Sequence, residues 1–154
     1  MELLYKNANI SEKAINKTLK SLNPYFKRLN EVWNKEKYTK PEAFINLPFN
    51  EAGVVEVINT KKQMVSEKLK YIVVIGIGGS NLGTKAIYNA LNGHFDNLQP
   101  DRFPKMIFLD TTYPQKFEKV KKTLNSAGPN EIIVNAISKS GKTLETLTNL
   151  ELLL

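Results

Sequence analysis

The sequence predicts an α/β fold built on a parallel sheet of βαβ units, and two observations carry this prediction. Short apolar runs recur at residues 71–77, 105–110 and 131–137, and each is followed by a loop and then by sequence with helical periodicity. The first run, YIVVIGI, is β-branched and does not alternate with polar residues, which is typical of a strand covered on both faces. This order predicts right-handed crossovers and a parallel sheet between layers of helices.

Residues 1–50 precede that domain and predict a helical lead followed by a connector. Ser11 is a plausible N-cap, and apolar residues recur at helical spacing after it. The pair Asn23-Pro24 predicts the end of this helix and the start of another, with proline at the first helical position. Residues 37–50 contain two prolines and lack regular periodicity, so we expect a connecting segment there.

Residues 51–154 predict the α/β domain itself, and its helices follow from their apolar spacing. A long helix is expected over about 51–69, and a charged amphipathic helix after the second strand carries Phe117, Val120 and Leu124. The helix predicted over 82–91 should bury a stripe formed by Leu82, Ala86, Ile87, Ala90 and Leu91. The sequence stops inside an apolar helical pattern, NLELLL, after only three strands, so we expect an incomplete domain, the front part of a longer protein.

Composition excludes several classes of function. The chain has no cysteine and one histidine, His94, so we expect neither a thiolate nor a multi-histidine metal site, and no cofactor. The formal charge of +7 comes mainly from lysines scattered along helical segments, without a basic stripe interleaved with aromatic residues, so a solvated surface is favoured over nucleic-acid binding. No apolar run is long enough to span a bilayer and no signal peptide is evident, so a cytoplasmic protein is expected.

Two loops predict a site for an anion. IGIGGSNLG at 75–83 and SKSGKT at 138–143 each follow a predicted strand and lead into a predicted helix, where backbone amides and the helix dipole attract negative charge. The binding candidates are Gly79, Ser80, Ser138, Lys139, Ser140, Gly141, Lys142 and Thr143. Hydroxyls, amides and lysines in this combination suit a dianionic phosphate.

Neither nucleotide motif fits these loops. A dinucleotide fingerprint beginning at Gly76 needs glycine at position 81, which is Asn81, and the nearest candidate for the ribose-binding acid, Asp110, lies about ten residues too far along the chain. A P-loop ending in GKT needs glycine where the chain has Ala136. A phosphate monoester held by both loops is therefore favoured, although capping and packing alone also explain individual glycines and threonines.

VVIGIGGSNLG followed at this distance by ISKSGKTLET resembles the glucose-6-phosphate isomerase (phosphoglucose isomerase) family, in the sugar-isomerase domain of its amino-terminal half. The resemblance covers roughly residues 40–154, and the second motif departs from the family form at Lys142 and Leu144. It implies that the candidate residues of the two loops hold the phosphate of glucose 6-phosphate or fructose 6-phosphate. It also implies a flavodoxin-like, three-layer domain and a homodimeric full-length protein.

The family reaction is an aldose–ketose isomerisation through an enediolate, in which a glutamate moves the proton, an arginine stabilises charge, and a histidine and a lysine open the ring. None of these four residues is matched in this chain, and neither His94 nor Glu145 corresponds to one of them. We therefore expect the fragment to be inactive. Two alternatives remain open: a non-catalytic regulatory domain that binds a sugar phosphate, and a P-loop nucleotide-binding protein.

Overall fold

The computed structural model describes residue 5, residues 7–33 and residues 38–154. The chain divides into two compact units, Met1–Ile58 and Asn59–Leu154, which are described separately. The parts of the predicted lead that fall on residues 1–4, 6 and 34–37 lie outside the described residues. The boundary expected between residues 50 and 51 stays a prediction.

The first unit contains one long helix, α1 (Glu12–Val32), followed by the 3₁₀ segment η1 (Pro41–Phe49). Ser11 caps α1 as predicted, because its side chain accepts a hydrogen bond from the backbone N–H of Ala14. The predicted break at Asn23-Pro24 is wrong, since Pro24 lies inside α1. An interior proline removes one helical hydrogen bond without forbidding the helix, and the helix-forming sequence on either side continues through it.

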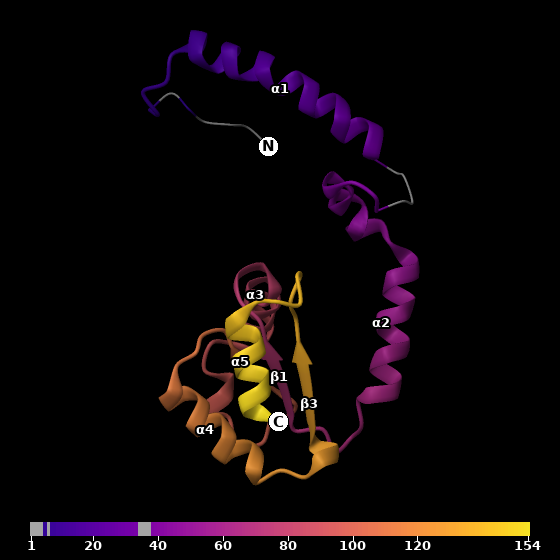
Figure 1. The fold of residues 1–154 in the computed structure, drawn as a ribbon, viewed down its shortest axis with the longest axis vertical. Coiled ribbons are helices and arrows are strands. Elements are labelled where there is room, and N and C mark those ends of the chain that lie inside the picture. The colour runs from indigo at the N-terminus through magenta and orange to yellow at the C-terminus, as the bar shows by residue number, and fades with distance from the viewer. Residues whose placement is uncertain (1–4, 6, 34–37) are drawn as a thin grey trace. The chain divides into compact units, whose positions relative to one another are not determined.

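The next helix, α2 (Glu51–Met64), starts where predicted but ends five residues earlier than the expected residue 69. After it, the strands and helices alternate as the sequence predicts: β1 (Tyr71–Ile75), α3 (Leu82–Asn92), β2 (Lys105–Leu109), α4 (Pro114–Asn125), β3 (Ile132–Ala136) and α5 (Leu144–Leu153). Short 3₁₀ turns precede α3, β2 and β3 at Gly78–Ser80, Asp96–Leu98 and Pro129–Glu131. Figure 1 shows this run of elements in magenta to yellow.

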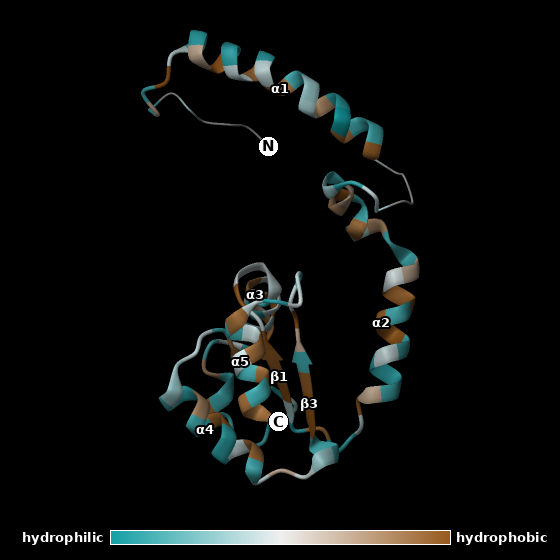
Figure 2. Cartoon of the chain, in the orientation of Figure 1, coloured by the Kyte–Doolittle hydropathy of each residue, from teal (hydrophilic) through white to brown (hydrophobic). Residues whose placement is uncertain are grey.

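The three strands form a parallel sheet in the order β2-β1-β3. Ile75 at the end of β1 is in register with Leu109 of β2 and Ala136 of β3, so all three strands end at the same edge. Figure 2 shows β1 and β3 mostly in brown, the hydrophobic end of the scale. The predicted parallel α/β fold is therefore confirmed.

The two faces of the sheet bury separate cores. On one face, Val74 and Phe108 pack against Tyr88 of α3. On the other, alternate residues of β1 and β2 pack against α4 and α5 through Val73, Ile75, Leu109, Phe117, Val120, Leu124, Leu150 and Leu153. Helices thus cover both faces, which gives the expected three layers, and the face predicted for α4 is confirmed.

The face predicted for α3 is wrong. The predicted stripe residues Leu82, Ile87 and Leu91 are exposed at 57, 64 and 79%. Tyr88 is the buried residue of this helix instead, with its ring 6.0 Å from that of Phe108. Helical periodicity identifies an apolar face but not its partner, and here a tyrosine makes the contact.

Tyr88 also belongs to a polar cluster near the amino-terminal end of β2. Its hydroxyl accepts hydrogen bonds from the backbone N–H of Met106, at 3.1 Å, and from the Arg102 guanidinium, at 2.6 Å, and donates to the Asp96 carboxylate. Arg102 also forms a bidentate ion pair with Asp96, which is only 1% exposed. The hydrogen bonds from Arg102 lower the pKa of Asp96 despite its burial, so this buried carboxylate is ionised and paired.

Candidate anion-binding site

The strand order brings together the two loops that the sequence predicts to bind an anion. The connection from β1 runs through α3 to β2 on one side, whereas β3 lies on the other side of β1. The connections that leave the neighbouring strands β1 and β3 lead to opposite faces of the sheet, with α3 on one and α5 on the other, which makes this pair a topological switch point. In open α/β sheets, ligands bind outside the carboxyl ends of the strands at such a switch point.

The two loops touch where they leave the sheet. The backbone N–H of Ile137 donates to the carbonyl of Ile75 at 2.8 Å, which extends the pairing of β3 with β1 into the loops. Gly76 is buried at this contact, and a Cβ atom added to it would lie 3.0 Å from the Ile137 carbonyl oxygen and 3.0 Å from Ser80 Cβ. Glycine at position 76 therefore permits the close approach of the loops.

The first loop turns tightly from β1 into α3. Gly78 has a φ of 54°, in the left-handed region that favours glycine. The backbone N–H of Ser80 donates to Ile77 at 3.1 Å, and that of Asn81 donates to Gly78 at 3.2 Å. Gly79 is exposed and Ser80 is half-buried, so these two predicted site residues lie on the accessible side of the turn.

The second loop is organised by its own hydroxyl groups. The Ser138 hydroxyl lies 3.0 Å from that of Thr143 and accepts the backbone N–H of Gly141 at 3.0 Å, while Ser140 accepts the N–H of Lys142 at 3.2 Å. Gly141 supplies the left-handed turn, with a φ of 67°. These hydrogen bonds concentrate hydroxyls and amides at the carboxyl end of β3.

The two lysines of this loop carry uncompensated charge. Lys139 and Lys142 are both exposed, and within the described part of the chain neither forms an ion pair. A loop with two ammonium groups and a cluster of hydroxyls is an environment that stabilises an anion.

Asp110 borders the first loop on its other side, because it follows β2. Its carboxylate accepts hydrogen bonds from Lys85 Nζ at 2.9 Å and from Lys116 Nζ at 3.0 Å, which joins α3, β2 and α4. Burial raises the pKa of Asp110, but the two ammonium groups outweigh this effect and the pKa lies below its ordinary value. The cluster is thus one carboxylate between two cations, with a net positive charge at this edge.

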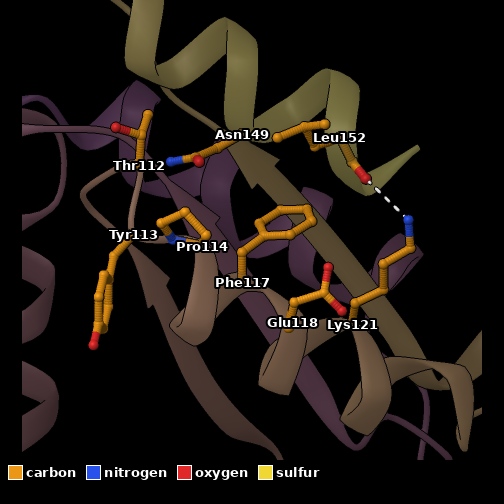
Figure 3. Close-up of a pocket in the computed structure, with 8 residues that line it drawn as sticks. All are labelled: Thr112, Tyr113, Pro114, Phe117, Glu118, Lys121, Asn149 and Leu152. Carbon is orange, nitrogen blue, oxygen red and sulfur yellow. Dashed lines mark hydrogen bonds between the residues drawn. The ribbon is translucent and has the colours of Figure 1, made fainter.

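A separate groove lies on the face covered by α4 and α5 (Figure 3). Its volume is about 210 Å³, and its lining residues are Thr112, Tyr113, Pro114, Phe117, Glu118, Lys121, Asn149 and Leu152. Two hydrogen bonds border it, from Asn149 to the Thr111 carbonyl at 3.2 Å and from Lys121 to the Leu152 carbonyl at 3.4 Å. None of the predicted site residues lines this groove.

His94 and Glu145, which the sequence does not match to a catalytic residue, lie outside the two loops. His94 is exposed in the turn after α3, edge-on to Phe95. Glu145 lies in the first turn of α5. Among the described residues there is no group of three His, Cys, Asp or Glu side chains placed to hold a metal, and no helix long and apolar enough to cross a membrane.

Asn81 makes a hydrogen bond in this region that the sequence does not predict. Motif matching identifies it only as a missing glycine, yet its side chain is completely buried and donates from Nδ2 to the carbonyl of Gly76. An asparagine immediately before a helix signals an N-cap. Nothing in the sequence indicates that it bonds backward into the loop instead.

Known proteins resemble this chain in sequence and in fold. The family described as phosphoglucose isomerase matches residues 54–153, which include both loops. Glucose-6-phosphate isomerase of Carboxydothermus hydrogenoformans is 37% identical over 121 residues, covering 75% of this chain and 25% of that protein. The probable glucose-6-phosphate isomerase of Methanococcus maripaludis is 28% identical over 160 residues, covering 96% of this chain and 33% of that protein.

A solved structure shares the fold. The crystal structure of a hypothetical protein from Thermus thermophilus superposes with a TM-score of 0.61 at 26% identity, covering 92% of this chain and 31% of that one. This chain therefore spans between a quarter and a third of the length of these three proteins. Because the family match extends over well more than half of its residues, the chain belongs to the phosphoglucose isomerase family.

Proposed function

We propose that this chain supplies the phosphate-binding loops of an enzyme that interconverts glucose 6-phosphate and fructose 6-phosphate. The phosphate lies between the loop that follows β1 and the loop that follows β3, held by Gly79, Ser80 and residues 138–143. The observation that carries the proposal is the adjacency of two loops rich in hydroxyls and amides at the switch point of the sheet. The family to which the chain belongs supplies the reaction.

Each loop has a distinct part in this proposal. Ser80 donates its hydroxyl to the phosphate, and the glycines before it allow the ligand to approach the backbone. Ser138, Ser140 and Thr143 supply hydroxyl donors from the second loop: the hydrogen bond between the Ser138 and Thr143 hydroxyls gives way to the phosphate, whereas Ser138 and Ser140 can donate while still accepting the loop amides. Lys139 and Lys142 add two positive charges, and Gly141 allows the left-handed turn that holds the loop in this shape.

The chemistry at the other end of the sugar requires groups that this chain does not match: a glutamate to move the proton between C1 and C2, an arginine beside the enediolate, and a histidine and a lysine for ring opening. In our proposal these residues belong to other parts of a homodimeric protein. The chain of residues 1–154 alone therefore binds sugar phosphate without converting it. Formation of glucose 6-phosphate from fructose 6-phosphate by this chain would contradict that part of the proposal.

Binding is tested by thermal shift with fructose 6-phosphate, 6-phosphogluconate and ATP. A ligand that binds only the folded chain raises its stability by RT ln(1 + [L]/Kd), so both sugar phosphates should raise the melting temperature. The double variant Ser80→Ala/Ser138→Ala should lose this increase while its unliganded melting temperature stays near that of the wild type. The matched control is Ser21→Ala/Ser126→Ala, which removes two exposed serine hydroxyls outside both loops.

ATP tests the nucleotide-binding alternative. Ala136 occupies the position where a P-loop has its first glycine, and it lies within β3 in register with Ile75. A residue paired in the sheet does not begin a loop that wraps a triphosphate, which disfavours this alternative. Stabilisation by ATP but by neither sugar phosphate would overturn our proposal in favour of nucleotide binding.

A further inference from the structure

Asn81 occupies the N-cap position of α3 but does not cap the helix. Asparagine is among the best N-cap residues because its side-chain oxygen accepts a backbone N–H from the first turn. Ser11 makes a bond of this kind at the start of α1. Asn81 instead directs its side chain back into the preceding loop, where Nδ2 donates to the carbonyl of Gly76.

This reversed bond has two physical consequences. It closes the turn between Gly76 and Asn81, together with the backbone bonds from Ser80 to Ile77 and from Asn81 to Gly78. It also withholds a side-chain cap from α3. Within the described residues, the first amides of this helix, at Leu82 and Gly83, have no hydrogen-bond acceptor, so they remain available to an anion.

The orientation of the Asn81 side chain is unfavourable for the stability of the fold. The side chain of Asn81 is completely buried, and its Oδ1 atom has no hydrogen-bond partner among the described residues. A buried polar atom without a partner is unfavourable. The orientation therefore fits a role in binding better than a role in folding.

The second loop repeats the pattern. Thr143 is the N-cap residue of α5 and also a good capping residue, yet its side chain makes no cap bond and its hydroxyl lies 3.0 Å from that of Ser138. Both helices that start at the proposed site thus begin with a residue able to cap, and both are left without a side-chain cap.

We propose that Asn81 is a positioning residue of the phosphate site, which holds the Gly76–Ser80 turn closed and keeps the first amides of α3 open for the phosphate. This inference rests on the proposed function of the two loops. Asn81 itself does not touch the phosphate, because its side chain is buried and bonded to Gly76.

The test is a titration of the ¹⁵N-labelled chain with inorganic phosphate and with fructose 6-phosphate, followed by amide chemical shifts. In the wild type, the amides of both loops and of Leu82 and Gly83 should shift. In Asn81→Ala, the shifts at 78–83 should be lost and affinity should fall about tenfold or more, whereas the shifts at 139–143 should persist. In Asn81→Asp the loss should be at least as large, since a carboxylate cannot donate to the Gly76 carbonyl and instead accepts the amides of α3.

Asn92→Ala is the matched control. Asn92 lies at the other end of α3 and also donates from Nδ2 to a backbone carbonyl, that of Tyr88, at 3.2 Å. This variant should leave the phosphate-induced shifts of both loops unchanged. An equal loss of first-loop shifts in Asn92→Ala would mean that any weakening of α3 suffices, and would overturn the assignment to Asn81.

The remaining outcomes separate the inference from the proposed function. No shift in either loop of the wild type would overturn both. Shifts of both loops in the wild type and equally in Asn81→Ala would overturn the inference and leave the proposed function standing. If the variants do not fold, the wild type decides: the Asn81 side-chain NH₂ should exchange slowly with solvent and stay unshifted on adding phosphate, and rapid exchange would overturn the inference.

Discussion

Substitution of Gly76 by alanine tests the contact that brings the two loops together. Gly76 is the first residue after β1 and is buried against the loop that follows β3. An alanine Cβ would lie 3.0 Å from the carbonyl oxygen of Ile137 and 3.0 Å from Cβ of Ser80. Neither atom can rotate away, because one belongs to the backbone and the other is directly attached to it.

The size of the effect follows from these distances. A separation of 3.0 Å to Ser80 Cβ lies about 0.5 Å inside the optimum of roughly 3.5 Å between carbon atoms, so both loops must move. Overpacking of this kind costs about 1–3 kcal/mol. For a unit the size of Asn59–Leu154, each kcal/mol lowers the melting temperature by about 4–8 °C, so we expect a decrease of at least about 4 °C.

Gly83→Ala is the matched control, because Gly83 lies in α3 and a Cβ atom added there would meet no heavy atom within 4 Å. Alanine is favoured over glycine within a helix by up to about 1 kcal/mol, so this variant should melt at or above the wild-type temperature. The assay is thermal unfolding followed by circular dichroism, for which Gly83→Ala is the control, together with phosphate titration, in which Gly76→Ala should bind more weakly than the wild type. Wild-type melting and binding in Gly76→Ala would refute the claim that this close approach shapes the site.

Three further predictions concern the framework around the site. Asp110→Asn should cost about 0.5–2 kcal/mol at pH 7, because its two lysine pairs are partly exposed. Folding lowers the pKa of Asp110, so its stabilising contribution is complete above the unfolded pKa of about 3.9 and is lost as the pH falls through the folded pKa. In urea denaturation, the difference in stability between the variant and the wild type should therefore shrink below about pH 4. A constant difference down to pH 2 would contradict this. Tyr88→Phe should lower the stability to urea denaturation by about 1–3 kcal/mol, because the Met106 amide and Arg102 lose a buried acceptor. An unchanged denaturation midpoint would rule out a stabilising role for the hydroxyl. Leu124→Ala should cost about 2–5 kcal/mol of stability, because Leu124 lies in the core under α4. Leu91→Ala should change stability by less than about 0.5 kcal/mol, because Leu91 is 79% exposed on α3. Similar losses in both variants would mean that the buried face of α3 is assigned wrongly.

Local sequence patterns predicted most of the helices and strands correctly. They failed where contacts between elements determine which face of a helix is buried or where a helix ends. The β-branched run at 71–77 and the spacing of Phe117, Val120 and Leu124 identify β1 and the buried face of α4, because both signals lie within a few residues of sequence. Pro24 misled because a proline only disfavours a helix interior and does not exclude it. The stripe on α3 misled because Tyr88 is held by Phe108 and by the polar cluster around Asp96, which lie outside the helix.

The candidate site divides in the same way. Glycines, hydroxyls and lysines after two predicted strands are visible as short motifs, so the sequence alone nominates both loops. The backward bond of Asn81 is not visible there, because the residue carries the ordinary signal of an N-cap and only the position of the Gly76 carbonyl redirects it.

By itself, the sequence determined the alternation of strands and helices and the family, and it identified two loops as candidates for anion binding, because periodicity and turn-forming residues act over short distances along the chain. Only the tertiary structure decided that β3 pairs with β1, which places Ile137, the residue immediately before the 138–143 loop, beside Gly76. Strand order depends on how each crossover packs on the sheet and on which edge remains open for the next strand. These are contacts between segments about sixty residues apart, and no local pattern encodes them.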